Sequence, residues 1–168
     1  FPREGNGWSY KYARRQWELV DRDDLKYKYL NAFDNAMVEL IGGTYNFQAL
    51  PVVKLWEKDD DQVLAFRRGN LVFVFNFSPS RSFTDYGVLT EPGEYNVVLS
   101  SDSPRFGGYG NIDESVAHFT VPDPLYSPLG LGWLKLYLPA RSAQVLKLRR
   151  RRADVRSGMY DFLRYSRK

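Results

Sequence analysis

The first 17 residues combine aromatic rings, arginines and glycines in a pattern that could bind a ligand. Indole and phenol rings present flat surfaces on which the apolar faces of sugars stack. Arginine donates paired hydrogen bonds to hydroxyl-rich or carboxylate-bearing partners. These residue types predict a binding segment with six candidate substrate-binding residues. The candidates are Arg3, Trp8, Tyr10, Arg14, Arg15 and Trp17.

The same segment also has a purely structural interpretation. Its rings could pack the loop against the rest of the protein, and we favour an ion pair with Glu4 or Glu18 for two of the three arginines. Gly5 and Gly7 would supply unusual backbone angles rather than chemistry. Both interpretations stay open on the sequence alone.

No other residue set predicts catalysis, a metal site or a cofactor. The run Asp59–Asp61 lacks the spacing of an EF-hand loop and predicts a solvated turn. His118 is the single histidine of a chain without cysteine, which excludes the usual zinc ligand sets. The sequence Gly107–Gly110 lacks the Lys-Ser/Thr of a phosphate loop and predicts a turn. Trp56 and Trp133 fall in expected strands, where we expect packing rather than sugar stacking.

The net charge of +4 comes from one end of the chain. Residues 149–168 hold eight Lys/Arg and two Asp, a net charge of +6, so residues 1–148 carry −2. A nucleic-acid-binding face needs basic residues across a folded surface, and we expect no nucleic-acid partner. No apolar run is long enough to predict a membrane span. The absence of cysteine is compatible with a reducing compartment, and we expect a cytoplasmic protein.

The spacing of apolar residues predicts one helix between Asp23 and Gly42. An apolar stripe recurs at three- and four-residue intervals along it, a pattern typical of an amphipathic helix. Asp21 or Asp23 is expected to cap its start, and Gly42-Gly43 to end it in a left-handed conformation. The stripe consists of Leu30, Phe33, Met37, Leu40 and Ile41.

After Gly43 the pattern becomes that of strands. Short runs rich in β-branched and aromatic residues alternate with glycine- and proline-containing turns, and Gly69-Asn70 predicts a hairpin turn. About eight strands at this spacing predict an antiparallel β-sandwich. The expected strands are residues 52–57, 62–68, 71–77, 83–89, 94–100, 115–121, 132–138 and 143–148. Beyond them, Val155, Met159, Phe162 and Leu163 recur at helical spacing in the basic tail.

The chain opens with Phe1–Asn6, Phe-Pro-Arg-Glu-Gly-Asn. This opening resembles the Phe-Pro-Arg-(Glu/Lys)-Gly-Asn segment of the glycogen and starch branching enzymes, a family of the α-amylase superfamily. The strand Leu71–Pro79 is similar to its (Leu/Val)-Phe-(Val/Ile)-Phe-Asn-Phe-His-Pro motif, with Ser78 in place of histidine. Tyr109 also stands where the family often has histidine. Further matching segments are residues 12–17, 25–34, 92–95, 99–102 and 106–108.

The resemblance implies a fold, an activity and a division of the chain. Residues 1–43 would be the last loop and helix of a catalytic (β/α)8 barrel, and residues 44–148 the C-terminal all-β domain of α-amylase type. Residues 149–168 would be a basic tail without a counterpart. Such enzymes cleave α-1,4 glucan and form α-1,6 branches with a retaining mechanism. The implied partners are α-glucan and the upstream barrel.

The family's acids belong to earlier barrel strands, so Glu4 is not expected to be catalytic and this chain alone should be inactive. Because Phe1 is not a methionine, we expect a piece of a larger protein. Three alternatives remain. The chain could be a non-catalytic carbohydrate-binding module or the C-terminal domain of another α-amylase superfamily hydrolase. It could also be an interaction domain whose arginine tail binds nucleic acid or an acidic partner.

Overall fold

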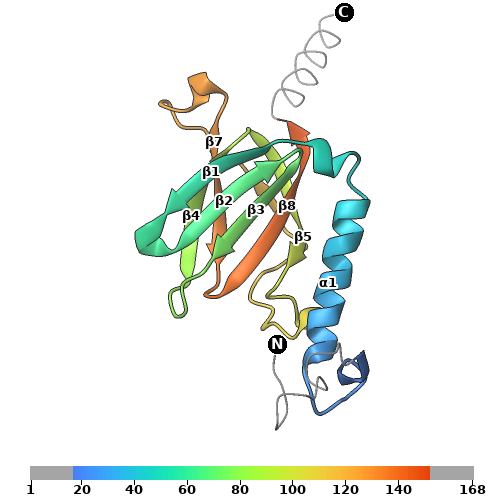
Figure 1. Cartoon of the computed structure of the whole chain (residues 1–168). Helices are drawn as coiled ribbons and strands as arrows, with labels where there is room; N and C mark the ends of the chain where they lie inside the picture. The colour runs from blue at the N-terminus through green and yellow to red at the C-terminus, as the bar shows by residue number, and fades with distance from the viewer. Residues whose placement is uncertain (1–16, 152–168) are drawn as a thin grey trace, which may run out of the picture.

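Eight antiparallel strands and a four-turn helix make up residues 17–151, the part of the chain that the computed structural model describes (Figure 1). The mainly β, antiparallel fold class predicted from the sequence is confirmed. The helix is α1 (Tyr27–Gly42). The strands are β1 (Val52–Lys58), β2 (Val63–Arg68), β3 (Leu71–Asn76), β4 (Phe83–Thr90), β5 (Gly93–Ser100), β6 (Ala117–Phe119), β7 (Gly132–Leu138) and β8 (Ser142–Arg151). Short 3-10 turns are η2 (Trp17–Leu19), η3 (Phe47–Ala49), η4 (Asp59–Asp61), η5 (Pro104–Phe106) and η6 (Ser127–Leu129).

The strands form two sheets of unequal size. The larger sheet has the order β1-β2-β3-β8-β5-β6, and the smaller consists of β4 and β7. A single antiparallel bridge between Val121 and Trp133 links the segment after β6 to β7. The two sheets face each other as the layers of a sandwich.

Alternation along each strand places the core between the two sheets. In β3, Val72 and Val74 are buried inside, whereas Phe73 and Phe75 point to the outer face. The largest buried ring is that of Tyr95 on β5, whose hydroxyl donates to the carbonyl of Glu91 at 2.7 Å. The fully buried leucines of this core are Leu134, Leu136, Leu138 and Leu146.

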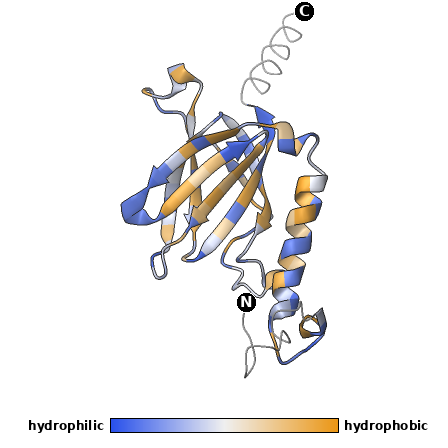
Figure 2. Ribbon diagram, in the orientation of Figure 1, coloured by the Kyte–Doolittle hydropathy of each residue, from blue (hydrophilic) through white to orange (hydrophobic). Residues whose placement is uncertain are grey.

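Helix α1 lies along the outer face of the larger sheet (Figure 1). Phe33, Ala36 and Leu40 pack on a small cluster that includes Leu99 and Val145. No residue of α1 is itself buried. Figure 2 shows apolar residues on both α1 and the strands beside it. None of the helices in the described residues is long and apolar enough to cross a membrane.

The predicted ends of the helix are wrong in detail. Lys26 occupies the N-cap position without a side-chain hydrogen bond to the helix. The aspartates instead form ion pairs, Asp23 with Lys28 at 3.0 Å and Asp24 with Arg22 at 2.5 Å. The helix does end at the two glycines, but Gly43 keeps a right-handed conformation with φ of −77°. Its N–H donates to the carbonyl of Glu39, so a left-handed residue is not needed there.

The predicted strands are confirmed to within one residue at each end, except for β6 and β8. The strand expected at residues 115–121 is only three residues long, because Asp113 accepts bonds from the N–H and hydroxyl of Ser115 and holds that residue in a turn. Strand β8 extends through Arg151, whose guanidinium lies 3.3 Å from the Glu91 carboxylate. The helical spacing noted from Val155 onward lies outside the described residues.

Asn76 connects strands of the two sheets through hydrogen bonds. It belongs to the strand motif that carries the family resemblance. Its buried side-chain amide donates to the carbonyls of Leu138 at 3.1 Å and Pro139 at 3.0 Å, and to that of Arg81 at 2.8 Å. Its side-chain oxygen accepts the N–H of Ser78 at 3.0 Å. The asparagine of this motif is therefore structural, joining β3 to the ends of β7 and of the β3–β4 loop.

Candidate functional site

Only one of the six predicted substrate-binding residues lies in the described part of the chain. Arg3, Trp8, Tyr10, Arg14 and Arg15 fall outside it. Trp17 begins η2 and is 67% exposed. The choice between sugar stacking and packing for the segment therefore stays a prediction.

Trp17 borders an open hollow of about 330 Å³ beside the first half of α1. Apolar groups of Leu19, Val20 and Leu30 line it, and Asn31 and Asp34 supply its polar groups. A hollow of this kind can receive the side chains of another domain or the face of a ligand ring.

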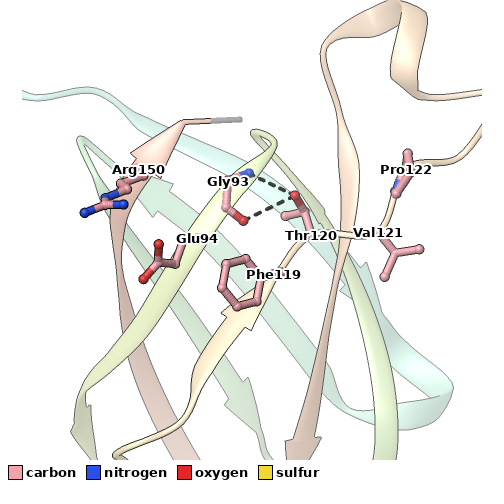
Figure 3. A pocket seen from close by; sticks show the side chains of 7 residues that line it. All are labelled: Gly93, Glu94, Phe119, Thr120, Val121, Pro122 and Arg150. Carbon is pink, nitrogen blue, oxygen red and sulfur yellow. Dashed lines mark hydrogen bonds between the residues drawn. The ribbon is translucent and has the colours of Figure 1, made fainter. Parts of the chain in front are cut away.

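A second hollow, of about 360 Å³, lies at the other end of the sandwich where β5 begins and β8 ends (Figure 3). Phe119 on β6 contributes an exposed ring, with Glu94 and Arg150 on one side of it and Val121 on the other. Sequence patterns did not predict this site. The alternation of β5 and β8 could have placed Glu94 and Arg150 on the outer face, but only the strand register brings them together.

A third feature is a loop built around a buried carboxylate. Asp102 accepts the N–H groups of Asn111 at 2.6 Å, Ile112 at 3.2 Å and Tyr109 at 3.3 Å. The Asp102 carbonyl accepts the N–H of Gly110 at 2.8 Å. The turn predicted for Gly107–Gly110 is thus confirmed, and it holds the Tyr109 ring in solvent.

The two strand tryptophans pack rather than face solvent, as predicted. Their rings meet edge to face with centroids 5.6 Å apart. Trp56 donates to the hydroxyl of Tyr86 at 3.2 Å, and Trp133 donates to Asp123 at 3.1 Å. The Tyr86 hydroxyl donates in turn to Asp61 at 3.0 Å, and burial raises the pKa of Tyr86.

The remaining acidic and histidine candidates form no reactive constellation in the described residues. The run Asp59–Asp61 is a 3-10 turn, but Asp61 is held by Arg81 and is not merely solvated. His118 is half-buried, and burial lowers its pKa against the smaller opposite effect of a hydrogen bond with the backbone of Lys135. No cluster of three or more metal-ligating side chains occurs within residues 17–151.

Comparison with known proteins gives one family and a consistent set of relatives. The family described as "Alpha amylase, C-terminal all-beta domain" matches residues 56–149. These residues run from β1 into β8 and include nearly the whole sandwich. The helix and the segment before it lie outside the match.

The relatives are named as branching enzymes, which is more specific than the description of the family. A "1,4-alpha-glucan-branching enzyme, chloroplastic/amyloplastic" of Oryza sativa subsp. japonica is 48% identical over 124 residues, 73% of this chain and 15% of that protein. The "1,4-alpha-glucan-branching enzyme" of Rhizophagus irregularis is 43% identical over 148 residues, 87% of this chain and 21% of that protein. That of Yarrowia lipolytica is 44% identical over 147 residues, 86% of this chain and 21% of that protein. The chain spans about a fifth or less of the length of these curated relatives.

Proposed function

Because the chain belongs to the family of α-amylase C-terminal all-β domains, we propose that it is the C-terminal part of a 1,4-α-glucan branching enzyme. The observation that carries this proposal is the identity of 43–48% to proteins of that name over 73–87% of the chain. The complete protein would cleave an α-1,4 glucan and rejoin it through an α-1,6 link. Its catalytic carboxylates would lie upstream, and this chain would support the barrel that holds them.

The surface of α1 supports a role at the junction with an upstream domain. The helix packs on the sandwich along one face only. Beside that face a second line of apolar side chains is exposed to solvent, which is unusual for a helix that has all its partners. These side chains are Tyr27, Leu30, Met37, Val38 and Ile41. We assign residues 1–43 to the barrel and 44–148 to the all-β domain, with this line of side chains as the contact of α1 with the rest of the barrel.

The outer face of the sheet continues this apolar surface. A groove of about 130 Å³ between α1 and β3 is lined entirely by apolar side chains, including Met37, Ile41 and Phe75. Phe75 stacks on the exposed ring of Phe77 with centroids 5.6 Å apart. Covering the helix and this groove with one domain would bury both surfaces at once.

The predicted sugar contacts belong to the same proposal. Loops that follow barrel strands gather at the face where barrel active sites lie. Arg3, Trp8, Tyr10, Arg14, Arg15 and Trp17 would then contact α-glucan at the edge of the active site. The cytoplasm is the compartment we propose, since the chain contains no cysteine. Two relatives, from rice and pea, are named as chloroplastic or amyloplastic, and a plastid is the alternative.

The test is a branching assay on two proteins, one expressed from the complete gene and one consisting of residues 1–168 alone. Each is incubated with amylose, and α-1,6 linkages are counted by NMR of the anomeric protons. We expect new α-1,6 linkages with the complete protein and none with the 168-residue chain. Folded complete protein that forms no branches would overturn the proposal, and so would branching by the chain alone.

A hydrolase of the α-amylase superfamily is the second candidate, because the matching family is named for α amylase. A hydrolase releases new reducing ends in step with each bond cleaved. Branching conserves the number of reducing ends after transfer. A reducing-sugar assay on the same samples therefore separates the two activities.

A further inference from the structure

Three strands place an aromatic ring, a carboxylate and a guanidinium in one row on the outer face of the sheet. Glu94 on β5 is the direct register partner of Phe119 on β6 and of Arg150 on β8. Directly paired residues of adjacent antiparallel strands project from the same face of a sheet. Neighbouring strands lie about 4.8 Å apart, so the row spans about 10 Å from Arg150 to Phe119. Figure 3 shows the three residues of this row, from Arg150 at the left to Phe119 near the centre.

The row forms one side of the 360 Å³ hollow, whose other wall is Val121 and Pro122. That volume falls within the range of about 300–1,000 Å³ typical of small-ligand sites. Phe119 is 65% exposed in it, so its ring is not needed to fill the core. The exposed side chains of Phe119 and Val121 line the hollow together with two hydrogen-bonding groups, and an apolar lining with a few polar groups is typical of a ligand site.

The backbone around the hollow is firmly held. Thr120 accepts the N–H of Gly93 through its hydroxyl at 2.9 Å, and the same hydroxyl lies 3.4 Å from the carbonyl of Gly93. A Cβ atom at Gly93 would lie 2.4 Å from the carbonyl oxygen of Arg150, so only glycine fits between these strands. The close approach fixes the relative positions of β5, β6 and β8. The row is therefore arranged before any ligand arrives.

We propose that this row, hereafter the Phe119 row, is a second α-glucan site, separate from the predicted contacts of the first 17 residues. The choice of glucan as ligand rests on the proposed function. A glucose unit has an apolar face for the Phe119 ring and hydroxyls that both donate and accept. Glu94 accepts from such hydroxyls and Arg150 donates to them.

Charge argues against other ligands. Glu94 and Arg150 carry opposite charges side by side, which favours a neutral ligand over a polyanion. A nucleic acid would meet the Glu94 carboxylate beside the ring on which a base would stack.

The position of the Phe119 row suggests what a second site would add. It lies at the end of the sandwich opposite to the start of α1 (Figure 1). A long glucan held there remains close to the rest of the protein when its other end dissociates. Tethering of this kind raises the effective concentration of the chain end at the first site.

The experiment is an NMR titration of the uniformly ¹⁵N-labelled 168-residue chain with maltoheptaose, followed by the same titration of two variants. Phe119→Ala removes the ring of the row. Phe77→Ala is the matched control, because Phe77 is a similarly exposed phenylalanine, at 61% against 65%, that follows the end of β3 and lies outside the row. The amides of both variants also report whether the fold is intact.

We expect the amides of Glu94, Phe119 and Thr120 to shift on titration of the parent chain and of Phe77→Ala with the same affinity. We expect Phe119→Ala to weaken binding about ten-fold, the effect typical of removing a central aromatic anchor. Glu94→Gln, which keeps the shape but not the charge, should weaken binding less than Phe119→Ala does. Shifts confined to other regions, or equal losses in the two phenylalanine variants, would overturn the second site.

The branching assay distinguishes this inference from the proposed function. If the complete protein forms branches but Phe119→Ala binds maltoheptaose like the parent chain, the second site is wrong and the proposed function stands. If Phe119-dependent binding is seen but the complete protein forms no branches, the site stands as a glucan site and the proposed enzyme is wrong. A parent chain that binds no maltoheptaose overturns the second site whatever the branching assay shows.

Discussion

The sandwich and helix α1 differ in how completely they bury their apolar side chains. The sandwich encloses a core whose leucines and valines are almost wholly hidden between its two sheets. Helix α1 has no buried residue and leaves Leu30 and Val38 largely in solvent. The sandwich therefore has the packing of a self-sufficient domain. The helix has the packing of an element that needs a further partner.

The largest effect expected from this difference comes from truncating equivalent leucines in the two regions. Leu146→Ala in β8 leaves a cavity in the closed core and should lower the free energy of unfolding by about 3 kcal/mol. Leu30→Ala on the exposed side of α1 should lower it by no more than about 0.5 kcal/mol. Urea denaturation of both variants measures the two values. Similar losses would mean that the helix surface is already covered in this chain.

A second comparison uses two asparagines. Asn76→Ala removes the amide group that contacts three carbonyls and the oxygen that accepts the N–H of Ser78, and should cost about 2 kcal/mol because the buried carbonyls lose their donor. Asn35→Ala, exposed on α1, is the control and should cost nothing, since alanine favours the helix. Thermal unfolding followed by circular dichroism gives both changes. An Asn76→Ala variant as stable as its parent would show that the amide network is dispensable.

A third comparison between the sandwich and α1 uses one glycine from each. A Cβ atom at Gly108 would lie 2.2 Å from the backbone of Asp102, so Gly108→Ala should destabilise the chain by about 1–2 kcal/mol. A Cβ atom at Gly42, the last residue of α1, meets nothing within 4 Å. Gly42→Ala should therefore stabilise the chain by about 0.5 kcal/mol through helix propensity. Opposite signs in urea denaturation are the expected result, and a shared sign would contradict it.

The smallest predicted effect concerns His118, whose pKa is lowered by burial. The fold favours its neutral form, so this stability is present above about pH 6.5 and is lost as the pH falls through the folded pKa. Because His118 is the single histidine, one-dimensional NMR of its ring proton gives the pKa without ambiguity. A value at or above that of an unfolded peptide would contradict the prediction. His118→Gln should lose less stability than the parent between pH 7.5 and pH 5.

Sequence patterns predicted the sandwich well because each strand has its own local pattern. Alternation in Leu71–Asn76 and the turn at Gly69-Asn70 needed no knowledge of distant residues. The start of the helix was not predicted correctly. Asp23 and Asp24 could either cap the helix or form ion pairs with neighbouring basic residues, and they form ion pairs. Propensity does not decide between these partners.

The candidate sites also divide into features that local sequence predicts and features that depend on strand pairing. The packing of Trp56 against Trp133 followed from their places in strands. The Phe119 row did not, because its three members come from three strands and meet only through the register of β5 with β6 and β8. Similarly, nothing local marks Asp102 as the anchor of the loop up to Ile112. Sites assembled across strands require the topology first.

Hydrogen exchange of the α1 amides tests most directly whether this helix belongs to an upstream catalytic domain. In the 168-residue chain, amides of α1 should exchange much faster than those of β3 and β8, because only one face of the helix is packed. In the protein expressed from the complete gene, the α1 amides should be protected by at least about 100-fold more, while β3 and β8 change little. Equal protection of α1 in the two proteins would contradict the assignment of residues 1–43 to a barrel.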